Sequence, residues 1–438
     1  MANQLDNSGF LHGRGGFQMI ERSEIGRTPY GGEIVYLKSD KPYEIAALRI
    51  FVSIHRVIKD IIKKPIKTIE DFISYINRHP DVCKPYVRRI LTFHHGDIGE
   101  MDNYGFYFKS VSRLFTFISW IPIGANRGIK GVGTELSLRY VEHGGFIHHK
   151  NEALRRLEQN AESLYRELRD RKVAKEDARY VLPLSTKTEE IIQVQLGRDL
   201  AKWANYLAKE PFSEVKAIGE HLVKWNEKEN GFSLPSVELP NSRMPLYKRD
   251  EDAQRTILRD FLKDKPNEIY YDPRVQALVW HTRRSIASFH QDVRNRQVYF
   301  WWPSWEAAIG GTDVYIPPWT PKEETKRIRD CHEHSIETSR DFFEKGDYEM
   351  AVYSLTLGRI LDLFCAIYGN SNIYETVRLR ACMRAQKEIR DQYRLIARSI
   401  AEKFPYRLGA RCETEGVCFE PQRELCPLYK RYVIGGKK

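Results

Sequence analysis

The chain has 438 residues, of which 42% are hydrophobic, and this supplies a buried core for one large domain or two ordinary ones. The formal net charge of +11 favours anionic partners, either a phosphorylated metabolite or a nucleic acid, and does not choose between them. No apolar run approaches the roughly 20 residues of a membrane span, and no signal-peptide pattern opens the chain, so we expect a cytoplasmic protein without membrane contacts.

The N-terminal part begins with a polar segment and continues into helices. Residues 1–40 are punctuated by glycine and predict an arm that closes with a short strand at residues 33–37. Between residues 42 and 79, apolar side chains recur three and four positions apart, which is the spacing of a buried helix face. We therefore expect packed helices directly after the arm.

The rest of the first half predicts a strand and further helices. Large side chains alternate over residues 104–108, which indicates a strand with one buried face, and a helix follows at residues 114–120. Amphipathic patterns predict a long helix over residues 151–171 and a closing helix over residues 213–225. Residues 226–265 have the proline, glycine and charge content of a linker, so we place a domain boundary there.

After the linker the same order of features begins again, which is typical of a tandem duplication. Helices are expected at residues 322–345, at residues 350–368 and from residue 377 to about residue 404. The last helix opens with V-R-L-R-A-C-M-R-A-Q-K-E-I-R, which has no Gly or Pro and carries many planar donors. Either these donors bind an anion, or they form a solvated basic face with pairs such as Arg384 and Glu388.

Two more segments carry donors suited to an anion. A glycine-rich basic loop precedes Ser137 and Arg139, and a hydroxyl and a guanidinium both donate to phosphate, the guanidinium through two parallel bonds. In the second half, Arg294 and Arg296 diverge about one turn after His290, so that one reaches a phosphate and the other a cofactor or a base edge. The alternative for this second segment is a basic, partly exposed surface.

The last part of the chain is rich in cysteine. Cys412, Cys418 and Cys426 lie in a turn-rich segment, and Cys382 on the preceding helix offers a fourth thiolate. Converging thiolates would hold zinc or, as a second choice, an iron–sulfur cluster, and the alternative is four ordinary reduced thiols. The odd total of 7 cysteines argues against a disulfide framework.

Several segments of the first half resemble motifs of the flavin-dependent thymidylate synthases. Residues 134–140 read T-E-L-S-L-R-Y and are similar to the N-E-x-S-x-R-Y end of the family's signature. Residues 178–184 read A-R-Y-V-L-P-L and are similar to A-R-x-V-L-P-L. His95 and Glu100 match two positions of the family's H-x-S-x-x-E-H motif, whereas other positions of that motif differ. The R-H-R part of the signature is not intact in this half.

The second half carries the complementary pieces. Residues 290–296 read H-Q-D-V-R-N-R and resemble the H-Q-x-x-R-H-R core, with Asn295 in place of the family's His. Residues 315–318 match Y-x-P-P, and residues 380–390 are similar to R-x-C-x-R-A-Q-x-E-I-R. The E-x-S-x-R piece is absent from this half. A single composite site built by both halves would account for what each half has lost.

The resemblance implies an α+β protein of two tandem thymidylate-synthase-complementing-protein-like repeats, each a small mixed or antiparallel sheet with long helices. The repeats would face each other as a pseudo-dimer within one chain, and self-association of this pseudo-dimer is expected. The expected parts are an N-terminal arm at 1–40, a first repeat at 41–225, a linker at 226–265, a second repeat at 266–404 and a cysteine-containing tail at 405–438.

The function implied by the resemblance is reductive methylation of dUMP to dTMP, with methylenetetrahydrofolate as carbon donor, NADPH as reductant and FAD as cofactor. The residues implied to bind dUMP, or another uridine nucleotide, are Glu135, Ser137, Arg139, Arg179, Gln291 and Arg380. The residues implied to bind FAD are His95, His290, Arg294, Asn295 and Arg296. No catalytic residue is assigned, because the flavin would carry the electron chemistry.

A diverged relative without this activity is the alternative. Such a paralogue would bind a nucleotide or a nucleic acid through the same arginines. A third interpretation is flavin-dependent methylation of uridine within RNA. All three use the same phosphate-binding residues, so the sequence leaves them open.

Overall fold

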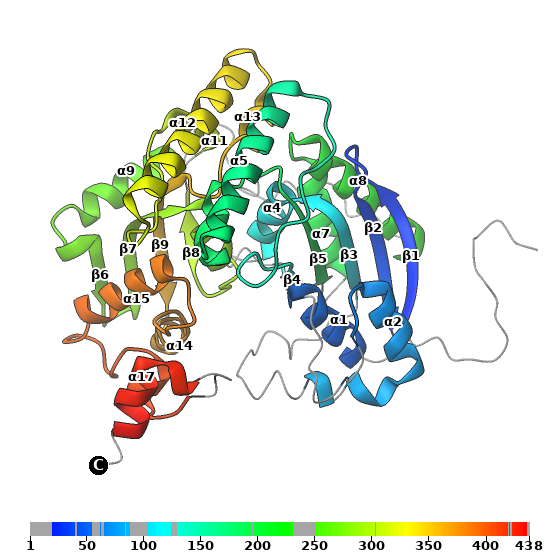
Figure 1. Cartoon of the computed structure of the whole chain (residues 1–438). Helices are drawn as coiled ribbons and strands as arrows, with labels where there is room; N and C mark the ends of the chain where they lie inside the picture. Colours follow the sequence, from blue (N-terminus) through cyan, green and yellow to red (C-terminus); the bar gives the residue numbers. More distant parts are fainter. Residues whose placement is uncertain are drawn as a thin grey trace, which may run out of the picture.

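The structure, a computed structural model, describes residues 20–39, 42–54, 62, 65–83, 85–87, 104–123, 129–194, 197–230, 251–302, 304–418, 420 and 423–435. Within these ranges the chain forms two antiparallel sheets, one in each half, with helices packed around them (Figure 1). The α+β class predicted from the sequence is confirmed. No helix in the described ranges is long and apolar enough to cross a membrane.

The sheet of the first half has the strand order β1-β2-β3-β5-β4, and every neighbouring pair is antiparallel. Its strands are β1 (Ile20–Arg27), β2 (Glu33–Ser39), β3 (Tyr104–Ser112), β4 (Gly131–Glu135) and β5 (Lys187–Val194). The β1–β2 turn places Gly31 at a φ of +83°, a conformation that glycine adopts without strain. The strand expected at residues 33–37 is therefore present, and residues 20–27 of the expected arm form a second strand beside it.

Helices cover both faces of this sheet. The helices of the first half are α1 (Pro42–Ile54), α2 (Ile69–Arg78), α4 (Arg113–Ile123), α5 (Glu152–Asp170), α6 (Lys175–Ala178), α7 (Gly197–Ala208) and α8 (Ser213–Asn230), with 3₁₀ turns η1 (Pro80–Val82) and η3 (Arg179–Val181). The long helices expected at 151–171 and 213–225 are thus confirmed. Phe106 and Phe108 join the main core, and Tyr107 joins a separate cluster with α1 and α2. The prediction that this strand has one buried face was wrong, because α1 and α2 bury its other face.

The sheet of the second half has the order β6-β7-β9-β8 and is also antiparallel. Its strands are β6 (Ile269–Asp272), β7 (Ala277–Ser285), β8 (Tyr299–Trp301) and β9 (Ile360–Tyr368). Its helices are α9 (Glu251–Leu262), α10 (Ile286–Asp292), α11 (Trp305–Gly310), α12 (Lys322–Glu344), α13 (Tyr348–Tyr353), α14 (Asn370–Arg380), α15 (Lys387–Ser399), α16 (Arg411–Thr414) and α17 (Pro427–Tyr429), with η4 (Pro266–Glu268), η5 (Arg423–Leu425) and η6 (Lys430–Ile434). The helix expected at 322–345 is confirmed.

Two predicted helices of the second half were wrong in part. The helix expected at residues 350–368 is the short α13 followed by β9, whose residues pair with β7 over its whole length. Tertiary pairing overrides the local pattern here, since a short apolar run fits a buried strand or a buried helix equally well. The helix expected over residues 377–404 is broken between α14 and α15, and Cys382 lies in this break instead of on a helix.

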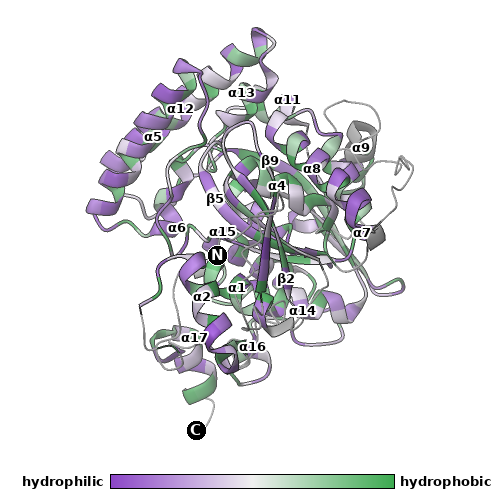
Figure 2. Ribbon diagram, turned by 90° about the vertical axis from the view of Figure 1, so that its right-hand side faces the viewer, coloured by the Kyte–Doolittle hydropathy of each residue, from purple (hydrophilic) through white to green (hydrophobic). Residues whose placement is uncertain are grey.

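The two halves share one apolar core and are joined by backbone hydrogen bonds. Pro183 and Thr356 form an antiparallel bridge, beside which the Leu184 N–H donates to the Leu355 carbonyl at 2.9 Å and the Leu357 N–H to the Leu182 carbonyl at 2.8 Å. We call the region where the two halves meet the junction. The helices α5 and α12 pack side by side across it, and Figure 2 shows both with long hydrophilic stretches. Side chains from the two halves therefore meet in the interior of the molecule.

Candidate functional site

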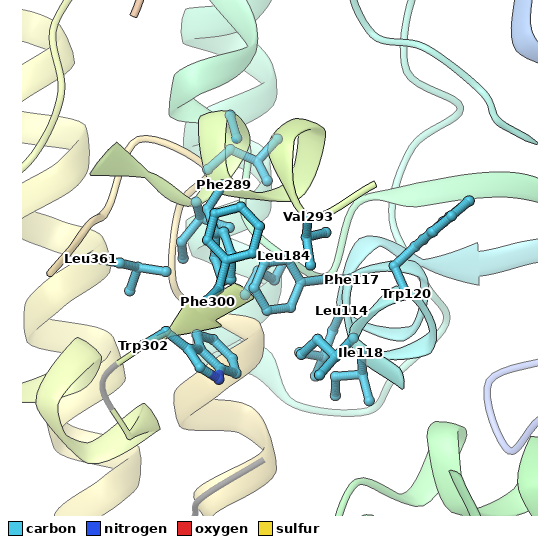
Figure 3. Close-up of a cluster of buried hydrophobic side chains, with 14 of the residues drawn as sticks. Leu114, Phe117, Ile118, Trp120, Leu184, Phe289, Val293, Phe300, Trp302 and Leu361 are labelled. Atoms are coloured by element: carbon cyan, nitrogen blue, oxygen red, sulfur yellow. The ribbon is translucent and has the colours of Figure 1, made fainter. Parts of the chain in front are cut away.

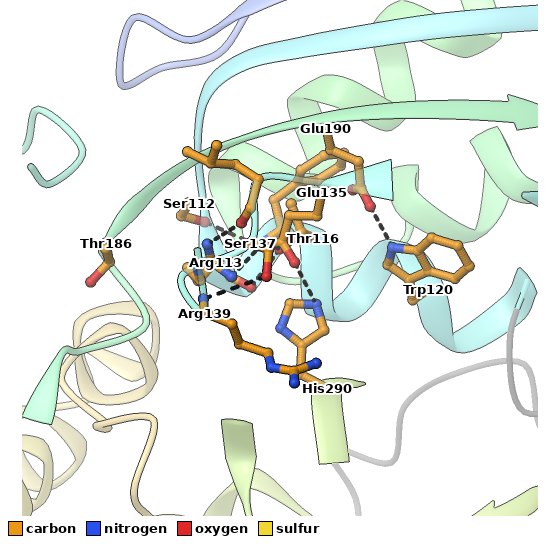
Figure 4. A network of polar contacts seen from close by, with 12 residues as sticks. Ser112, Arg113, Thr116, Trp120, Glu135, Ser137, Arg139, Thr186, Glu190 and His290 are labelled. Carbon is orange, nitrogen blue, oxygen red and sulfur yellow. Dashed lines mark hydrogen bonds and ion pairs between the residues drawn. The ribbon is translucent and has the colours of Figure 1, made fainter. Parts of the chain in front are cut away.

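A buried carboxylate at the end of β4 is the point where the polar groups of the two halves meet. Glu135 is 3% exposed, and its Oε1 accepts a hydrogen bond from Thr116 Oγ1 at 2.8 Å and lies 2.9 Å from an Arg113 guanidinium nitrogen. From the second half, His290 Nε2 lies 3.3 Å from Oε2, and Arg294 donates to the same oxygen. Figure 4 shows Arg113 and Thr116 of α4 and His290 of α10 converging on Glu135.

The neighbouring cations keep Glu135 ionised. Burial alone would raise the pKa of its carboxyl, but Arg113, Arg294 and, in acid where its imidazole is protonated, His290 lower this pKa to about 2. Burial and the adjacent guanidinium groups lower the pKa of His290 to about 3, although Glu135 opposes this. At neutral pH the imidazole of His290 is therefore uncharged, and the charge of Glu135 is balanced by the two arginines.

A second buried carboxyl lies opposite Glu135 on β5 and behaves in the opposite way. Burial and the nearby charge of Glu135 raise the pKa of Glu190 to about 8. Its oxygens accept from the Trp120 indole N–H and, at 3.3 Å, from Ser119 Oγ. The Arg294 guanidinium lies 5.2 Å from the centroid of the Trp120 ring. One junction thus holds an ionised carboxylate and a protonated carboxylic acid, an arrangement that active sites use to separate acid from base.

This difference predicts a specific pH dependence of stability. The pKa of Glu190 is raised in the folded state, so the native protein holds an extra proton between about pH 4.5 and pH 8, and stability falls as pH rises through this window. Glu190→Gln should remove this loss, at most about 1.4 kcal/mol per pH unit, and should flatten the pH profile. Urea unfolding of both proteins between pH 5 and pH 8.5 measures it. Parallel profiles would show that Glu190 is already ionised at neutral pH.

Arg179 is fixed by a hydrogen-bonded chain that crosses the junction. Its NH2 donates to Gln386 Oε1 at 2.5 Å, and Gln386 Nε2 donates to the Tyr180 hydroxyl. That hydroxyl donates in turn to Glu388 Oε2 at 3.2 Å, and the Ser285 N–H and hydroxyl hold the same carboxylate at 2.6 and 2.7 Å. Gln386 is the residue that precedes α15, so the break between α14 and α15 lets its side chain turn inward to Arg179.

Ser137 and Arg139 lie on the same side of the junction, just after β4. Arg139 pairs with Glu176 through its Nε, and its NH2 donates to the main-chain carbonyl of Arg384 in the second half. The Ser137 N–H donates to the Ser53 carbonyl at the end of α1 at 3.0 Å, which fixes the backbone, and its hydroxyl accepts weakly from the Arg139 N–H at 3.4 Å. Arg139 therefore reaches the second half, whereas these contacts of Ser137 lie within the first.

Arg380 and Gln291 meet in the second half. Arg380 Nε lies 3.1 Å from Asp292 Oδ1, and its NH2 donates to the Gln291 carbonyl at 3.3 Å. Asp292 is fully buried and also pairs with Arg284 and accepts from the Tyr393 hydroxyl at 3.0 Å. Arg380 is thus anchored at the end of α14 and does not belong to a freely solvated basic face, which was one of the two sequence interpretations.

The remaining predicted cofactor residues have separate surroundings. Asn295 donates through its side chain to Thr376 Oγ1 at 3.2 Å, and Arg296 donates to the Gly131 carbonyl of β4 at 3.4 Å. Arg296 therefore reaches the first half, whereas Asn295 stays within the second. His95 lies outside the described residues, so its predicted role stays a prediction.

The junction carries an excess of positive charge and unused hydrogen-bonding atoms. Its guanidinium groups are those of Arg113, Arg139, Arg179, Arg294 and Arg380. Burial lowers the pKa of Arg113 to about 10, with a further contribution from Arg179 and Arg294. Among the residues that the structure describes, the Nε atoms of these three arginines and Oε1 of Gln291 are buried without a hydrogen-bond partner. Buried donors without partners beside surplus positive charge suit an anionic ligand.

Sequence reasoning missed several residues of this junction. Arg113, Thr116 and Glu190 were not assigned to the site, although each is a polar residue that directly borders apolar residues of a predominantly apolar segment. That signal marks a buried polar group, since such groups need partners, but it does not reveal which partners they find. Gln386 was quoted only as part of a motif, and its contact with Arg179 depends on the break before α15.

The cysteines do not support the predicted metal centre. Cys412 lies in α16 and Cys426 precedes α17; burial and the neighbouring thiols of Cys382, Cys418 and Cys426 raise the pKa of Cys412 to about 12. In the described part of the chain, no group of three or more His, Cys, Asp or Glu side chains is arranged to hold a metal ion. The zinc or iron–sulfur site predicted at these four cysteines therefore finds no support in the described residues.

Comparison with known proteins places the first half. Residues 59–224 match the family model described as thymidylate synthase complementing protein, which confirms for this segment the resemblance read from its motifs. No curated protein matches the chain. Among solved structures, a UMP/dUMP methylase PolB from Streptomyces cacaoi bound with 5-Br dUMP is similar with a TM-score of 0.27 and 14% identity, covering 38% of this chain and 81% of that chain.

Proposed function

We propose that this chain, whose residues 59–224 match the thymidylate synthase complementing protein family, methylates a uridine nucleotide at the junction of its two halves, converting dUMP to dTMP. The observation that carries the proposal is the convergence of arginines from both halves around Glu135, with buried donors that lack partners. A nucleotide monophosphate supplies the dianionic phosphate that such a set of donors can neutralise.

The binding roles follow from the chemistry of each side chain. Ser137, Arg139 and Arg179 from the first half would contact the phosphate, because a hydroxyl and two guanidinium groups can all donate hydrogen bonds to its oxygens. Arg380 would close the site from the second half, where Asp292 already orients it. Gln291 offers a buried Oε1 without a partner in the described residues, and an amide can pair with the donor and acceptor edge of uracil.

Glu135 would act as a positioning residue. Its ionised carboxylate holds Arg113 and Arg294 in place, so the donors are oriented before the nucleotide arrives. His290, uncharged and nine-tenths buried, can accept or donate one proton at a ring nitrogen next to this carboxylate. Both groups are buried from bulk water, which strengthens each charge interaction.

FAD would be held by Arg294, Asn295 and Arg296, with His290 beside them. These residues fit the group, because Arg294 keeps an unused buried Nε and the set consists of donors suited to a pyrophosphate or to ring oxygens and nitrogens. When bound and reduced by NADPH, the flavin would supply the hydride that turns a methylene group from methylenetetrahydrofolate into a methyl group. The residues of the chain contribute binding, orientation and charge.

The proposed organisation is a tandem pair of repeats that face each other as a pseudo-dimer. The first repeat would cover 41–225 and the second 266–404, joined by a linker at 226–265 and followed by the tail at 405–438. What supports it is that β2-β3-β5-β4 and β6-β7-β9-β8 are the same order of strands, and that the Arg179–Gln386 contact and the Glu135–Arg294 contact both join the halves.

An anaerobic turnover experiment tests the proposed function. Purified protein is supplied with FAD, NADPH, methylenetetrahydrofolate and dUMP, and dTMP is measured by chromatography. We expect dTMP that depends on all four additions, and no methylated product when an RNA of the same uridine concentration replaces dUMP. Methylated uridine in the RNA would redirect the proposal to a nucleic-acid substrate. No product from either substrate would reject a methylating enzyme and leave a binding protein.

A further inference from the structure

Two buried serine–glutamate–tyrosine clusters mark equivalent positions in the two halves. They consist of Ser112, Glu214 and Tyr353, and of Ser285, Glu388 and Tyr180. In each cluster the serine ends a strand, caps the next helix and donates to the glutamate. A tyrosine from the other half donates to the same carboxylate, at 3.1 Å from Tyr353 and at 3.2 Å from Tyr180. Positions counted from these clusters can therefore be compared between the halves.

The polar site around Glu135 has a counterpart, which we call the second position, built by the equivalent residues with the roles of the two halves exchanged. Its side chains are apolar. Counting from the serines pairs Thr116 with Phe289 and His290 with Phe117. On β4, Glu135 pairs with Glu190 of β5. On the equivalent strand β8, Trp301 is the last residue that pairs with β9, and the next residue, Trp302, occupies the position that corresponds to Glu135. The correspondences, with the polar residue first, are Glu135 with Trp302, Thr116 with Phe289, His290 with Phe117, Arg294 with Ile121, Arg179 with Val352 and Gln386 with Phe212.

The contacts correspond as well as the positions do. Glu135 contacts Thr116 and His290. Its counterpart Trp302 contacts the counterparts of those two residues: the centroid of its ring lies 5.5 Å from that of Phe289 and 5.1 Å from that of Phe117. Trp302 is 2% exposed, and Figure 3 shows Phe117, Phe289 and Trp302 packed against one another in the cluster of buried apolar side chains. Trp305 packs against the same ring at 5.2 Å and against Phe212 at 6.3 Å.

We propose that the second position is an apolar packing core that takes no ligand, so that each chain holds one nucleotide site. The one-site statement rests on the proposed function of the polar junction. A phosphate at the second position would lose its hydration without meeting a guanidinium group among the corresponding residues, and the indole N–H groups of Trp302 and Trp305, which are buried there without partners among the described residues, carry no charge to replace one, so its burial is unfavourable. The aromatic rings instead fill the volume, and their packing stabilises the contact between the two halves.

Calorimetric titration of the full chain with dUMP tests the number of sites. We expect saturation at one dUMP per chain, with no second, weaker binding phase up to millimolar dUMP. Two dUMP molecules per chain would overturn the inference and leave the proposed function standing. Absence of any dUMP binding would instead reject the proposed function. The thermal unfolding experiment below then tests whether the second position is a filled core.

Thermal unfolding of Trp302→Ala measures that packing independently of any nucleotide. Removing a buried indole from a filled core should lower the melting temperature by roughly 3–5 °C, whereas Trp319→Ala, which removes a tryptophan that is 46% exposed, should shift it by less than about 1 °C. The folded Trp302→Ala protein should still bind one dUMP. A melting temperature equal to that of Trp319→Ala would show that the second position is loosely filled and would contradict the inference.

Discussion

Replacing Glu135 with Gln is expected to lower the free energy of unfolding by about 3–5 kcal/mol. The substitution keeps the shape of the side chain but removes its charge, and it leaves the buried Arg113 and the adjacent Arg294 without their common counter-ion. Removing one partner of a buried charge pair lowers the free energy of unfolding by far more than the intact pair adds to it, because the remaining charge is buried without a counter-ion. Urea unfolding at pH 7, followed by circular dichroism, measures the difference.

Glu152→Gln is the matched control for this change. Glu152 also pairs with an arginine, Arg156, but its side chain is 63% exposed and that of Arg156 is 72% exposed. Its replacement should therefore alter stability by less than about 0.5 kcal/mol. Equal effects of the two substitutions would show that Glu135 does not hold the arginines of the junction together.

The lowered pKa of Glu135 also predicts how the stability of the wild-type protein changes in acid. The pKa of Glu135 is lowered in the folded state to about 2, so its contribution to stability is complete above the pKa of an unfolded glutamate. This contribution is lost as pH falls from about 4.5 towards 2, whereas that of Glu190 is lost as pH rises from about 4.5 to 8. The protein should therefore be most stable in mildly acidic solution, apart from the effects of its other titrating groups.

Replacing Arg380 with Ala is expected to weaken dUMP binding on the order of 100-fold while the protein stays folded. The loss corresponds to the charge-assisted hydrogen bonds that a guanidinium makes with a phosphate or a base oxygen. Folding should survive, since Asp292 keeps its bonds to Arg284 and Tyr393 after Arg380 is removed. Calorimetric titration with dUMP, together with the near-ultraviolet circular dichroism spectrum, separates the two effects.

Arg398→Ala is the control for that experiment. Arg398 lies in the last turn of α15 and is exposed, so its removal changes the net charge by the same amount without touching the junction. We expect its dUMP affinity to stay within about twofold of the wild type, because an exposed charge is screened by salt. If both variants lose affinity equally, general electrostatic attraction explains nucleotide binding and Arg380 has no specific role.

The parts of the fold that could be predicted are those with a long, uninterrupted pattern. The helix over Glu152–Asp170 shows its apolar positions at helical spacing, and the strand Tyr104–Ser112 shows its alternating aromatic residues. The order of the sequence motifs also indicated which residues come from which half. The structure brings Arg294 of the second half to Glu135 of the first, and Arg139 of the first half to the backbone of Arg384.

What the sequence did not reveal depends on partners far away in the chain. Residues 360–368 are apolar enough for a helix, and only pairing with Ala277–Ser285 makes them a strand. The break between Arg380 and Lys387 lies in a run of good helix formers, and the inward hydrogen bond from Arg179 to Gln386 accompanies it. The protonated state of Glu190 likewise follows from the charge of Glu135 across the strand pair, which no local pattern encodes.

A crystal structure of the protein with dUMP tests most directly whether the two halves build one nucleotide site. We expect the phosphate to be contacted by Arg139 and Arg179 from the first half and the nucleotide to be closed in by Arg380 from the second, with the space around Trp302 filled by side chains. A nucleotide that contacts arginines of one half only, or that binds away from Glu135, would contradict the account.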